Sequence, residues 1–156
     1  MYIIYNLLMI GAFFLVMPYF IYRSICEKGF TRRMRQSLGG IRDEEIEAVA
    51  LKGCIWIHGA SVGEIVATSP LVKEIRKAMP EIPILVSAVT VGGYDMARQI
   101  IPEADAIIYF PLDLPFVSES VVKRIRPRIF MPVETELWPN LLRAPVSYTH
   151  LTLPTT

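Results

Sequence analysis

This sequence has little net charge, few cysteines and none of the common ligand-binding motifs, and each shortage excludes some classes of function. The 156 residues carry a formal net charge of only +1, so no overall basic surface argues for nucleic acid as a partner. The two cysteines, Cys26 and Cys54, lie far apart in segments of different character, which predicts no disulfide and fits a reducing compartment. We find no GxGxxG or GxxxxGK[ST] motif and no metal-ligand cluster, and we expect no serine nucleophile elbow.

Charged residues are also missing from one long stretch at the N-terminus. Residues 2–22 form an apolar run of 21 residues, close to the length that a helix needs to cross a bilayer. Tyrosines stand at both of its ends, and Arg23 opens a basic segment directly after it. A cleaved signal peptide is the alternative, but no Lys or Arg precedes the run and no Ala-x-Ala site follows it. We therefore predict a transmembrane anchor over 1–23, a single pass, and a cytoplasmic position for the rest of the chain.

The next segment, 24–53, is basic at first and then acidic. Apolar residues interleave with its bases up to the pair Gly39-Gly40, as in a helix that lies on an anionic membrane surface. A solvated basic linker is the alternative. The residues after the glycine pair predict a short connector helix that ends at Gly53.

From residue 54 to 143 the sequence alternates between β-rich runs and helical patches, which predicts an α/β domain. Expected strands are 54–58, 84–88, 106–110 and 128–133, and expected helices are 64–79, 93–101 and 117–125. Each pair of successive strands is far enough apart for a helical crossover, so the strands should be parallel. The turns that follow the strands then meet at one edge of the sheet, where open α/β folds bind ligands.

Small residues, hydroxyls and carboxylates concentrate in these turns. The candidate binding residues are Ser61, Gly63 and Glu64 after the first strand, Thr90 and Gly92 after the second, and Glu134, Glu136 and Asn140 after the fourth. Glu64 is the first candidate for a general base, although acidic residues in a first helical turn commonly just complement the helix dipole. Glu134 and Glu136 could share acid/base work or cap a following turn, and His58, at a strand end, could be a base or a structural residue.

Taken together, these residues resemble a known family, the 3-deoxy-D-manno-octulosonic acid (Kdo) transferases. The similarity rests on the N-terminal apolar run and on these motifs: Ile55-Trp56-Ile57-His58, Ser61-Val62-Gly63-Glu64, the 90–92 turn, Tyr109-Phe110-Pro111-Leu112-Asp113, and Glu134-Thr135-Glu136-Leu137-Trp138-Pro139-Asn140. It covers residues 1 to about 143.

The resemblance implies an inverting glycosyltransferase of the GT-B type, built from two Rossmann-like domains and attached to the inner membrane. Such an enzyme transfers Kdo from CMP-Kdo to the lipid A precursor (lipid IVA) in lipopolysaccharide biosynthesis, without a metal or another cofactor. By the resemblance, Glu64 is the general base on the acceptor hydroxyl. The other candidates named above are then acceptor-binding residues.

The sequence departs from this family in two ways. The family continues into a second, donor-binding domain that this chain does not reach, and residues 144–156 do not continue the pattern of the fold. We therefore expect 54–143 to be the acceptor half of the enzyme, 144–156 to be a non-native tail, and the fragment to be inactive alone. Rival interpretations are a membrane-tethered module that binds an anionic lipid without catalysis, and a different two-domain sugar transferase.

Overall fold

The computed structural model describes residues 2–27, 29–134 and 138–143. Its elements run in the order α1 (Tyr2–Cys26), α2 (Phe30–Ser37), α3 (Asp43–Ala50), β1 (Ile55–Gly59), α4 (Val62–Ala78), β2 (Ile84–Ala88), α5 (Val91–Ile100), β3 (Ala106–Tyr109), α6 (Pro115–Ile125), β4 (Ile129–Pro132) and α7 (Pro139–Arg143). From β1 to β4, strands alternate with helices as the sequence predicts.

The four strands form a parallel sheet in the order β3-β2-β1-β4, which confirms the predicted α/β class. In its register, Ile57 of β1 lies between Val86 of β2 and Met131 of β4. β1 and β2 are buried along their whole length, which explains why they read as continuous apolar runs rather than alternating ones. The chain leaves β1 in one direction toward β2 and β3, and β4 then returns to the other side of β1.

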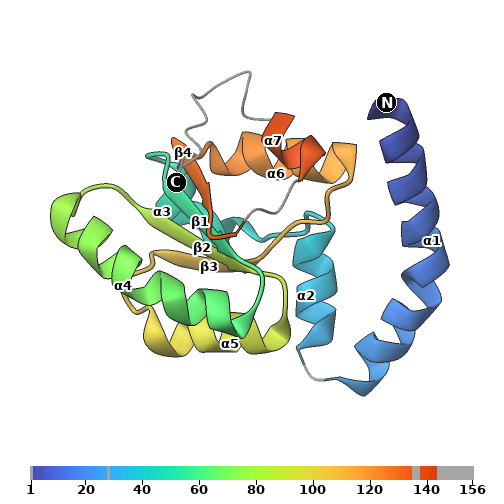
Figure 1. Cartoon of the computed structure of the whole chain (residues 1–156), viewed down its shortest axis with the longest axis horizontal. Coiled ribbons are helices and arrows are strands. Elements are labelled where there is room, and N and C mark those ends of the chain that lie inside the picture. The colour runs from blue at the N-terminus through green and yellow to red at the C-terminus, as the bar shows by residue number, and fades with distance from the viewer. Residues whose placement is uncertain (1, 28, 135–137, 144–156) are drawn as a thin grey trace.

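Helices cover both faces of the sheet (Figure 1). One apolar cluster joins alternate strand residues such as Ile57 and Val86 to Ile65 of α4 and Ala97 of α5. The cluster on the opposite face is built around Trp56 and packs α3 and α6 against the sheet, through residues that include Val49, Val121 and Ile125. Successive strand residues point to opposite faces, so each strand contributes to both clusters.

Helix α2 packs against the edge strand β3. The backbone N–H of Tyr109 donates to Gln36 Oε1 over 2.8 Å, and Ser37 Oγ donates to the carbonyl of Phe110 over 3.0 Å. Phe30, Gln36 and Ser37 are accordingly buried. The segment that the sequence assigns to a membrane surface therefore joins the same packed body as the sheet.

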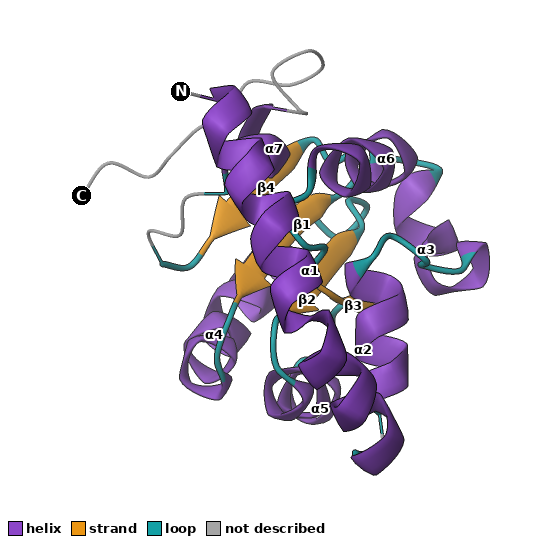
Figure 2. Cartoon of the chain, turned by 90° about the vertical axis from the view of Figure 1, so that its right-hand side faces the viewer, coloured by secondary structure: helices purple, strands orange, loops and turns teal. Residues whose placement is uncertain are grey.

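Helix α1 runs beside this body (Figures 1 and 2). Over Ile3–Cys26 it is long enough to span a membrane and has a mean hydropathy of 1.9, which is a weak sign of membrane association. Two side chains near its start reach the domain. The Tyr5 hydroxyl donates to Asp113 Oδ2 over 2.8 Å, and Asn6 Oδ1 accepts from Asn140 Nδ2 over 3.0 Å.

Candidate functional site

Glu64 lies in the first turn of α4, directly after the carboxyl end of β1. Ser61 caps this helix, with its Oγ accepting from the Glu64 N–H over 3.3 Å. The Glu64 carboxylate returns the interaction, since Oε2 accepts from the Ala60 N–H at 2.8 Å and Oε1 from the Ser61 N–H at 3.2 Å. This is a complete capping box, so Glu64 does perform the helix-end role that the sequence offers as the alternative to catalysis.

Several opposing effects set the pKa of Glu64. Partial burial raises it, but hydrogen bonds from Ser61 and from the Ala60 and Ser61 backbone, together with nearby His58, outweigh burial and bring the pKa below the ordinary glutamate value. Glu64 is therefore ionised at neutral pH. A carboxylate that is ionised and only partly buried can accept a proton from a hydroxyl that binds next to it.

The start of α5 lies next to the start of α4. Thr90 caps α5 through a hydrogen bond from the Gly93 N–H to Oγ1, 3.0 Å long. A methyl group added at Gly92 would approach Val62 Cγ2 to 3.4 Å, and one added at Gly93 would lie 3.7 Å from the Ser61 carbonyl carbon. Ser61, Gly63, Thr90 and Gly92 are all exposed. The structure thus brings five predicted site residues, Glu64 among them, to one exposed edge formed by two helix N-termini.

The end of β4 reaches the same edge from the other side of β1. The Val133 N–H donates to the His58 carbonyl over 2.9 Å, and the next residue, Glu134, is exposed. Glu136 lies outside the described residues. The predicted neighbourhood of Glu64 and Glu134 follows from the strand order, because β1 and β4 are adjacent at the point where that order reverses.

His58 lies beneath this edge and is buried. Its ring stacks on Phe110 with centroids 3.8 Å apart, and Nδ1 lies 3.0 Å from Ser87 Oγ. Ser87 Oγ also accepts from Trp56 Nε1 over 2.8 Å. The sequence did not reveal this Trp56–Ser87–His58 arrangement, because its partners are 29 and 31 positions apart and meet only through strand pairing.

Asn140 occupies a different place from the other candidates. The residue is only 4% exposed, and its side-chain amide donates to the Asp113 carbonyl over 2.6 Å as well as to Asn6. Asp113 is fully buried and caps α7, accepting from the N–H groups of Asn140 and Leu141. Asn140 thus joins α7 to α1 and to the loop after β3, and its predicted contact with an acceptor stays a prediction.

One expectation from the sequence needs correction. Residues 59–63, Gly59-Ala60-Ser61-Val62-Gly63, do have the GxSxG spacing of a serine nucleophile elbow, between a strand and a helix. The conformation differs from a strained elbow, however, since Ser61 has extended backbone angles (φ −110°, ψ 167°) and its Oγ caps α4. The nearby histidine, His58, is buried against Phe110 and Ser87. The geometry therefore favours a helix cap over a nucleophile at Ser61.

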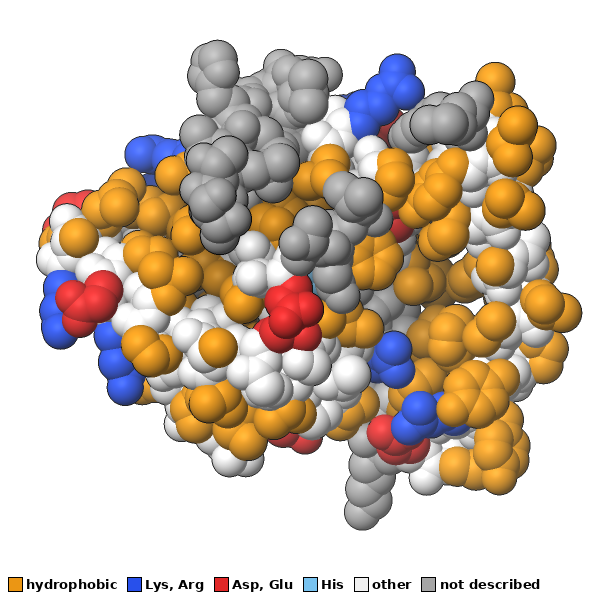
Figure 3. Space-filling view, viewed as in Figure 1, with side chains coloured by type: hydrophobic (Ala, Val, Ile, Leu, Met, Phe, Trp, Pro, Cys, Tyr) orange, Lys and Arg blue, Asp and Glu red, His pale blue; other side chains and the backbone are white. Residues whose placement is uncertain are grey.

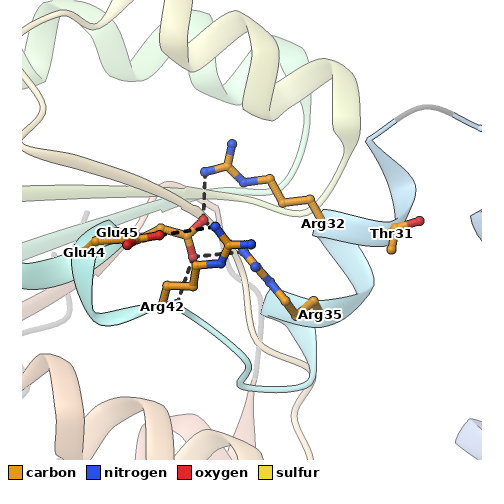
Figure 4. A pocket seen from close by; sticks show the side chains of 6 residues that line it. All are labelled: Thr31, Arg32, Arg35, Arg42, Glu44 and Glu45. Carbon is orange, nitrogen blue, oxygen red and sulfur yellow. Dashed lines mark hydrogen bonds and ion pairs between the residues drawn. The ribbon is translucent and has the colours of Figure 1, made fainter.

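A pocket of about 600 Å³ lies away from this edge, between α2 and α3 (Figure 4). Arg32 and Arg35 of α2 both donate to Glu45 of α3, over 2.9 Å and 3.0 Å. Glu45 Oε2 also accepts from the Arg42 N–H over 2.9 Å. The pocket is thus built around an ion-pair network that ties α2 to α3.

The exposed edge offers a proton acceptor and bare backbone groups, but no cluster of metal ligands occurs among the described residues. The edge presents a positioned carboxylate, Glu64, beside the N-termini of α4 and α5. Positive helix ends favour anionic ligands or charge that develops on oxygen. Proton abstraction from a bound hydroxyl fits this arrangement.

Comparison with known proteins points to one family. A family model described as 3-deoxy-D-manno-octulosonic-acid transferase (kdotransferase) matches residues 31–147. The match therefore includes the exposed edge, and it extends into residues 144–147 of the segment that the sequence assigns to a non-native tail.

Two of the three relatives described here bear the same enzyme name as the family model. A 3-deoxy-D-manno-octulosonic acid transferase of Haemophilus influenzae is 36% identical over 88 residues, which cover 56% of this chain and 21% of the relative. A bifunctional glycosyltransferase/methyltransferase of Fusobacterium nucleatum is 33% identical over 140 residues (88% of this chain, 20% of the relative). A 3-deoxy-D-manno-octulosonic acid transferase of Chlamydophila psittaci is 29% identical over 143 residues (89% and 32%). The chain thus spans about a fifth to a third of the length of these curated relatives.

Proposed function

The chain belongs to the family of 3-deoxy-D-manno-octulosonic acid (Kdo) transferases, and we propose that it is the acceptor-binding part of a glycosyltransferase of lipopolysaccharide biosynthesis. The reaction is transfer of Kdo from CMP-Kdo to the lipid A precursor, lipid IVA. The observation that carries the proposal is the position of Glu64, a carboxylate with a lowered pKa at the carboxyl end of β1.

Glu64 has a defined task in this reaction. Its carboxylate takes the proton of the acceptor hydroxyl while the hydroxyl oxygen bonds to the anomeric carbon of Kdo. The bond from that carbon to the phosphate oxygen of CMP breaks on the opposite face, and its electron pair leaves with CMP. A single displacement of this kind inverts the configuration at the anomeric carbon. Ser61, Gly63, Thr90, Gly92 and Glu134 surround the acceptor, and Glu136 and Asn140 complete the predicted set.

The capping box of α4 supports the role of Glu64 as general base as well as its role as a helix cap. Backbone N–H groups of Ala60 and Ser61 hold the carboxylate in one orientation, which a base needs if it is to meet a bound hydroxyl. Capping and catalysis therefore use the same carboxylate without conflict. The lowered pKa keeps that carboxylate ionised at neutral pH, which is the form that a base needs.

We propose that the donor site lies in the part of the relatives' length that this chain does not span. The chain spans at most about a third of its relatives, and the strand order β3-β2-β1-β4 is that of the first strands of a Rossmann fold. We assign the chain to the first half of a GT-B enzyme, inactive without its second half.

The domain is held at the cytoplasmic face of the inner membrane through α1. The apolar length of α1 and Arg23 at its end support this location, because anionic lipids attract bases at that face. The location is the same whether α1 crosses the membrane once, as the sequence predicts, or lies along its surface.

Replacing Glu64 tests the proposal in a protein that joins this chain to the C-terminal part of a relative. Glu64→Gln keeps the size of the side chain and can still form a capping box, so the fold and lipid binding should persist while Kdo transfer is lost. The matched control is Glu119→Gln on α6, which removes an exposed carboxylate paired with Lys123 and should leave transfer unchanged. Full transfer by Glu64→Gln would overturn the role of Glu64. If the chain is a lipid-binding module without catalysis, neither the joined protein nor its variants would transfer Kdo.

A further inference from the structure

Both ends of α1 contact the same domain. Near its start, Tyr5 and Asn6 are hydrogen-bonded to Asp113 and Asn140. Near its end, the Ser24 carbonyl accepts from Thr31 Oγ1 over 3.2 Å, and the rings of Phe20 and Phe30 lie 6.1 Å apart.

A membrane-spanning helix cannot keep contacts of this kind. Tyr5 and Arg23 are 18 residues apart, which is about 27 Å along a helix, nearly the thickness of the hydrocarbon core. A spanning α1 would place these two residues at opposite surfaces of the bilayer. A domain on one side of the membrane could then contact only one of them.

Exposure along α1 divides it into two faces. Residues that face the domain are half-buried and recur with helical spacing: Tyr5, Asn6, Met9, Ile10, Phe13, Phe20 and Ser24. Residues on the opposite face are exposed and apolar: Ile4, Leu7, Leu8, Phe14, Leu15, Ile21, Tyr22 and Ile25, with Leu15 82% exposed. Figure 3 shows hydrophobic side chains along the outer side of α1.

The composition of the exposed face indicates what covers it. Residues 2–22 carry no charge, so this face offers hardly any polar group except tyrosine hydroxyls. A surface that binds another protein normally has a polar rim with hydrogen bonds to the partner. Tyrosine near both ends of the helix and bases beside its last turn, Arg23 and Arg33, are instead typical of a lipid interface.

We infer that α1 lies along the membrane surface, docked on the domain through Tyr5 and Asn6, with its exposed face in the lipid. Helices that lie in an interface usually have a charged face toward water. In α1 the side that would otherwise face water is covered by the domain instead. The polar residues of the apolar run thus act as docking contacts.

This arrangement also fixes how the domain faces the membrane. Asp113 and Asn140 follow β3 and β4, so the start of α1 lies against the carboxyl edge of the sheet, the edge that carries Glu64. That edge is then held next to the lipid. The consequence that a lipid acceptor meets Glu64 at the membrane surface rests on the proposed function, whereas the docking of α1 does not.

Depth measurements on the full chain test the inference. Single cysteines carrying a spin label are placed at Leu7, Phe14 and Ile21 on the exposed face and at Ile10, Phe13 and Phe20 on the docked face. The background is Cys26→Ser, and Cys54 stays because it is fully buried. In vesicles of phosphatidylethanolamine and phosphatidylglycerol, accessibility to oxygen relative to a water-soluble nickel complex reports depth.

The two arrangements give opposite results at neighbouring positions. A docked helix predicts a several-fold higher ratio at Phe14 than at Phe13, and similar ratios at Leu7, Phe14 and Ile21. A spanning helix predicts equal, maximal ratios at Phe13 and Phe14 and low ratios toward both ends, which would overturn the inference. Low ratios at all six positions, or a doubled mass without lipid, would overturn it in favour of a protein partner.

A second pair of variants tests the docking contacts. Tyr5→Phe with Asn6→Leu removes both hydrogen bonds to the domain, and the difference between Phe13 and Phe14 should then shrink. Tyr22→Phe, which removes an exposed hydroxyl from the same helix, should leave it unchanged. An unaltered difference in the double variant would contradict docking through these residues. Since no donor sugar is used, failure here is distinct from failure of the proposed reaction.

Discussion

The hydroxyl of Tyr5 donates a hydrogen bond to Asp113 Oδ2 over 2.8 Å, across 108 positions of the chain. The same buried carboxylate accepts from the backbone N–H groups of Asn140 and Leu141 and from Ser118 Oγ at 3.2 Å. One side chain therefore ties α1, α6 and α7 together. A buried carboxylate with several donors is costly to replace, because every donor loses its partner at once.

Asp113→Asn should lower the free energy of unfolding by about 2 kcal/mol or more. The asparagine amide has only one acceptor oxygen, and its NH2 group would face N–H and O–H groups that also donate. Tyr5→Phe should cost only about 1 kcal/mol, the usual contribution of one hydrogen bond. Urea unfolding in mild detergent measures both. The double variant should be less destabilised than the sum of the single ones, and strict additivity would show that the two residues do not interact.

Ser61→Ala should raise the pKa of Glu64, because the hydrogen bond from Ser61 is one of the causes that lower it. The lost cap should also cost about 1 kcal/mol of stability. Thr90→Ala removes the equivalent cap of α5 and should cost a similar amount without moving the pKa of Glu64. Titration of the side-chain carboxyl signals by NMR distinguishes the two variants. An equal pKa shift in both would indicate that the shift comes from general loosening of the fold.

The stability contributed by Glu64 should depend on pH in a defined direction. Because its pKa is lower in the folded state, the contribution is fully present above the ordinary glutamate pKa of about 4.3 and is lost as pH falls through the folded-state value. The difference in urea midpoint between the wild-type chain and Glu64→Gln should therefore be constant near neutrality and shrink in acid. A difference that grows in acid would contradict the lowered pKa.

Gly93→Ala and Gly63→Ala should have opposite effects on stability. A methyl group at Gly93 would lie 3.0 Å from Thr90 Oγ1 and 3.3 Å from Ala88 Cβ, whereas one at Gly63 meets only Ser61 Oγ, at 3.9 Å. Gly93→Ala should therefore destabilise the chain by about 1 to 3 kcal/mol through overpacking, while Gly63→Ala should be neutral or stabilise α4 by up to about 1 kcal/mol. If Gly63→Ala folds well but abolishes transfer in the two-domain protein, the exposed backbone at Gly63 contacts the substrate.

The two cysteines should react at very different rates with a thiol reagent in detergent at pH 8. Burial, with a contribution from Asp105, raises the pKa of Cys54 to about 12, and Cys26 is exposed. One thiol should therefore react quickly in the folded chain and two in urea. Rapid reaction of both thiols without denaturant would show that Cys54, which directly precedes β1, is not buried as described. The variant Cys26→Ser identifies the fast thiol.

The fold of residues 54–143 could largely be predicted because its signals are local. The expected strand 84–88 has the bounds of β2, and the expected helix 117–125 differs from α6 only at its start. Pro115 explains that difference, since proline fits the first turn of a helix and α6 begins there. Ser61 and Thr90 could be placed at turns for a similar reason, because small hydroxyl residues before a helical pattern are typical caps.

The rest depended on contacts between distant residues. Asn6 lies within the apolar run 2–22, yet its Oδ1 accepts a hydrogen bond from Asn140. Asn140 belongs to a predicted binding motif, yet its amide donates to Asp113 and Asn6. The Trp56–Ser87–His58 arrangement likewise exists only because β1 pairs with β2 in one register. A sequence pattern gives the type of a polar group but not the partner that satisfies it.

By itself, the sequence determined the alternation of strands and helices, the parallel sheet and the loops at its carboxyl edge, because periodicity and turn chemistry act over a few residues. Only the tertiary structure decided where α1 lies. An uncharged run of 21 residues is long enough to cross a bilayer, but its length and composition also allow it to lie along the surface. The docking inferred above rests on the hydrogen bonds of Tyr5 and Asn6 to Asp113 and Asn140, residues that the fold brings to the start of α1 from far along the chain.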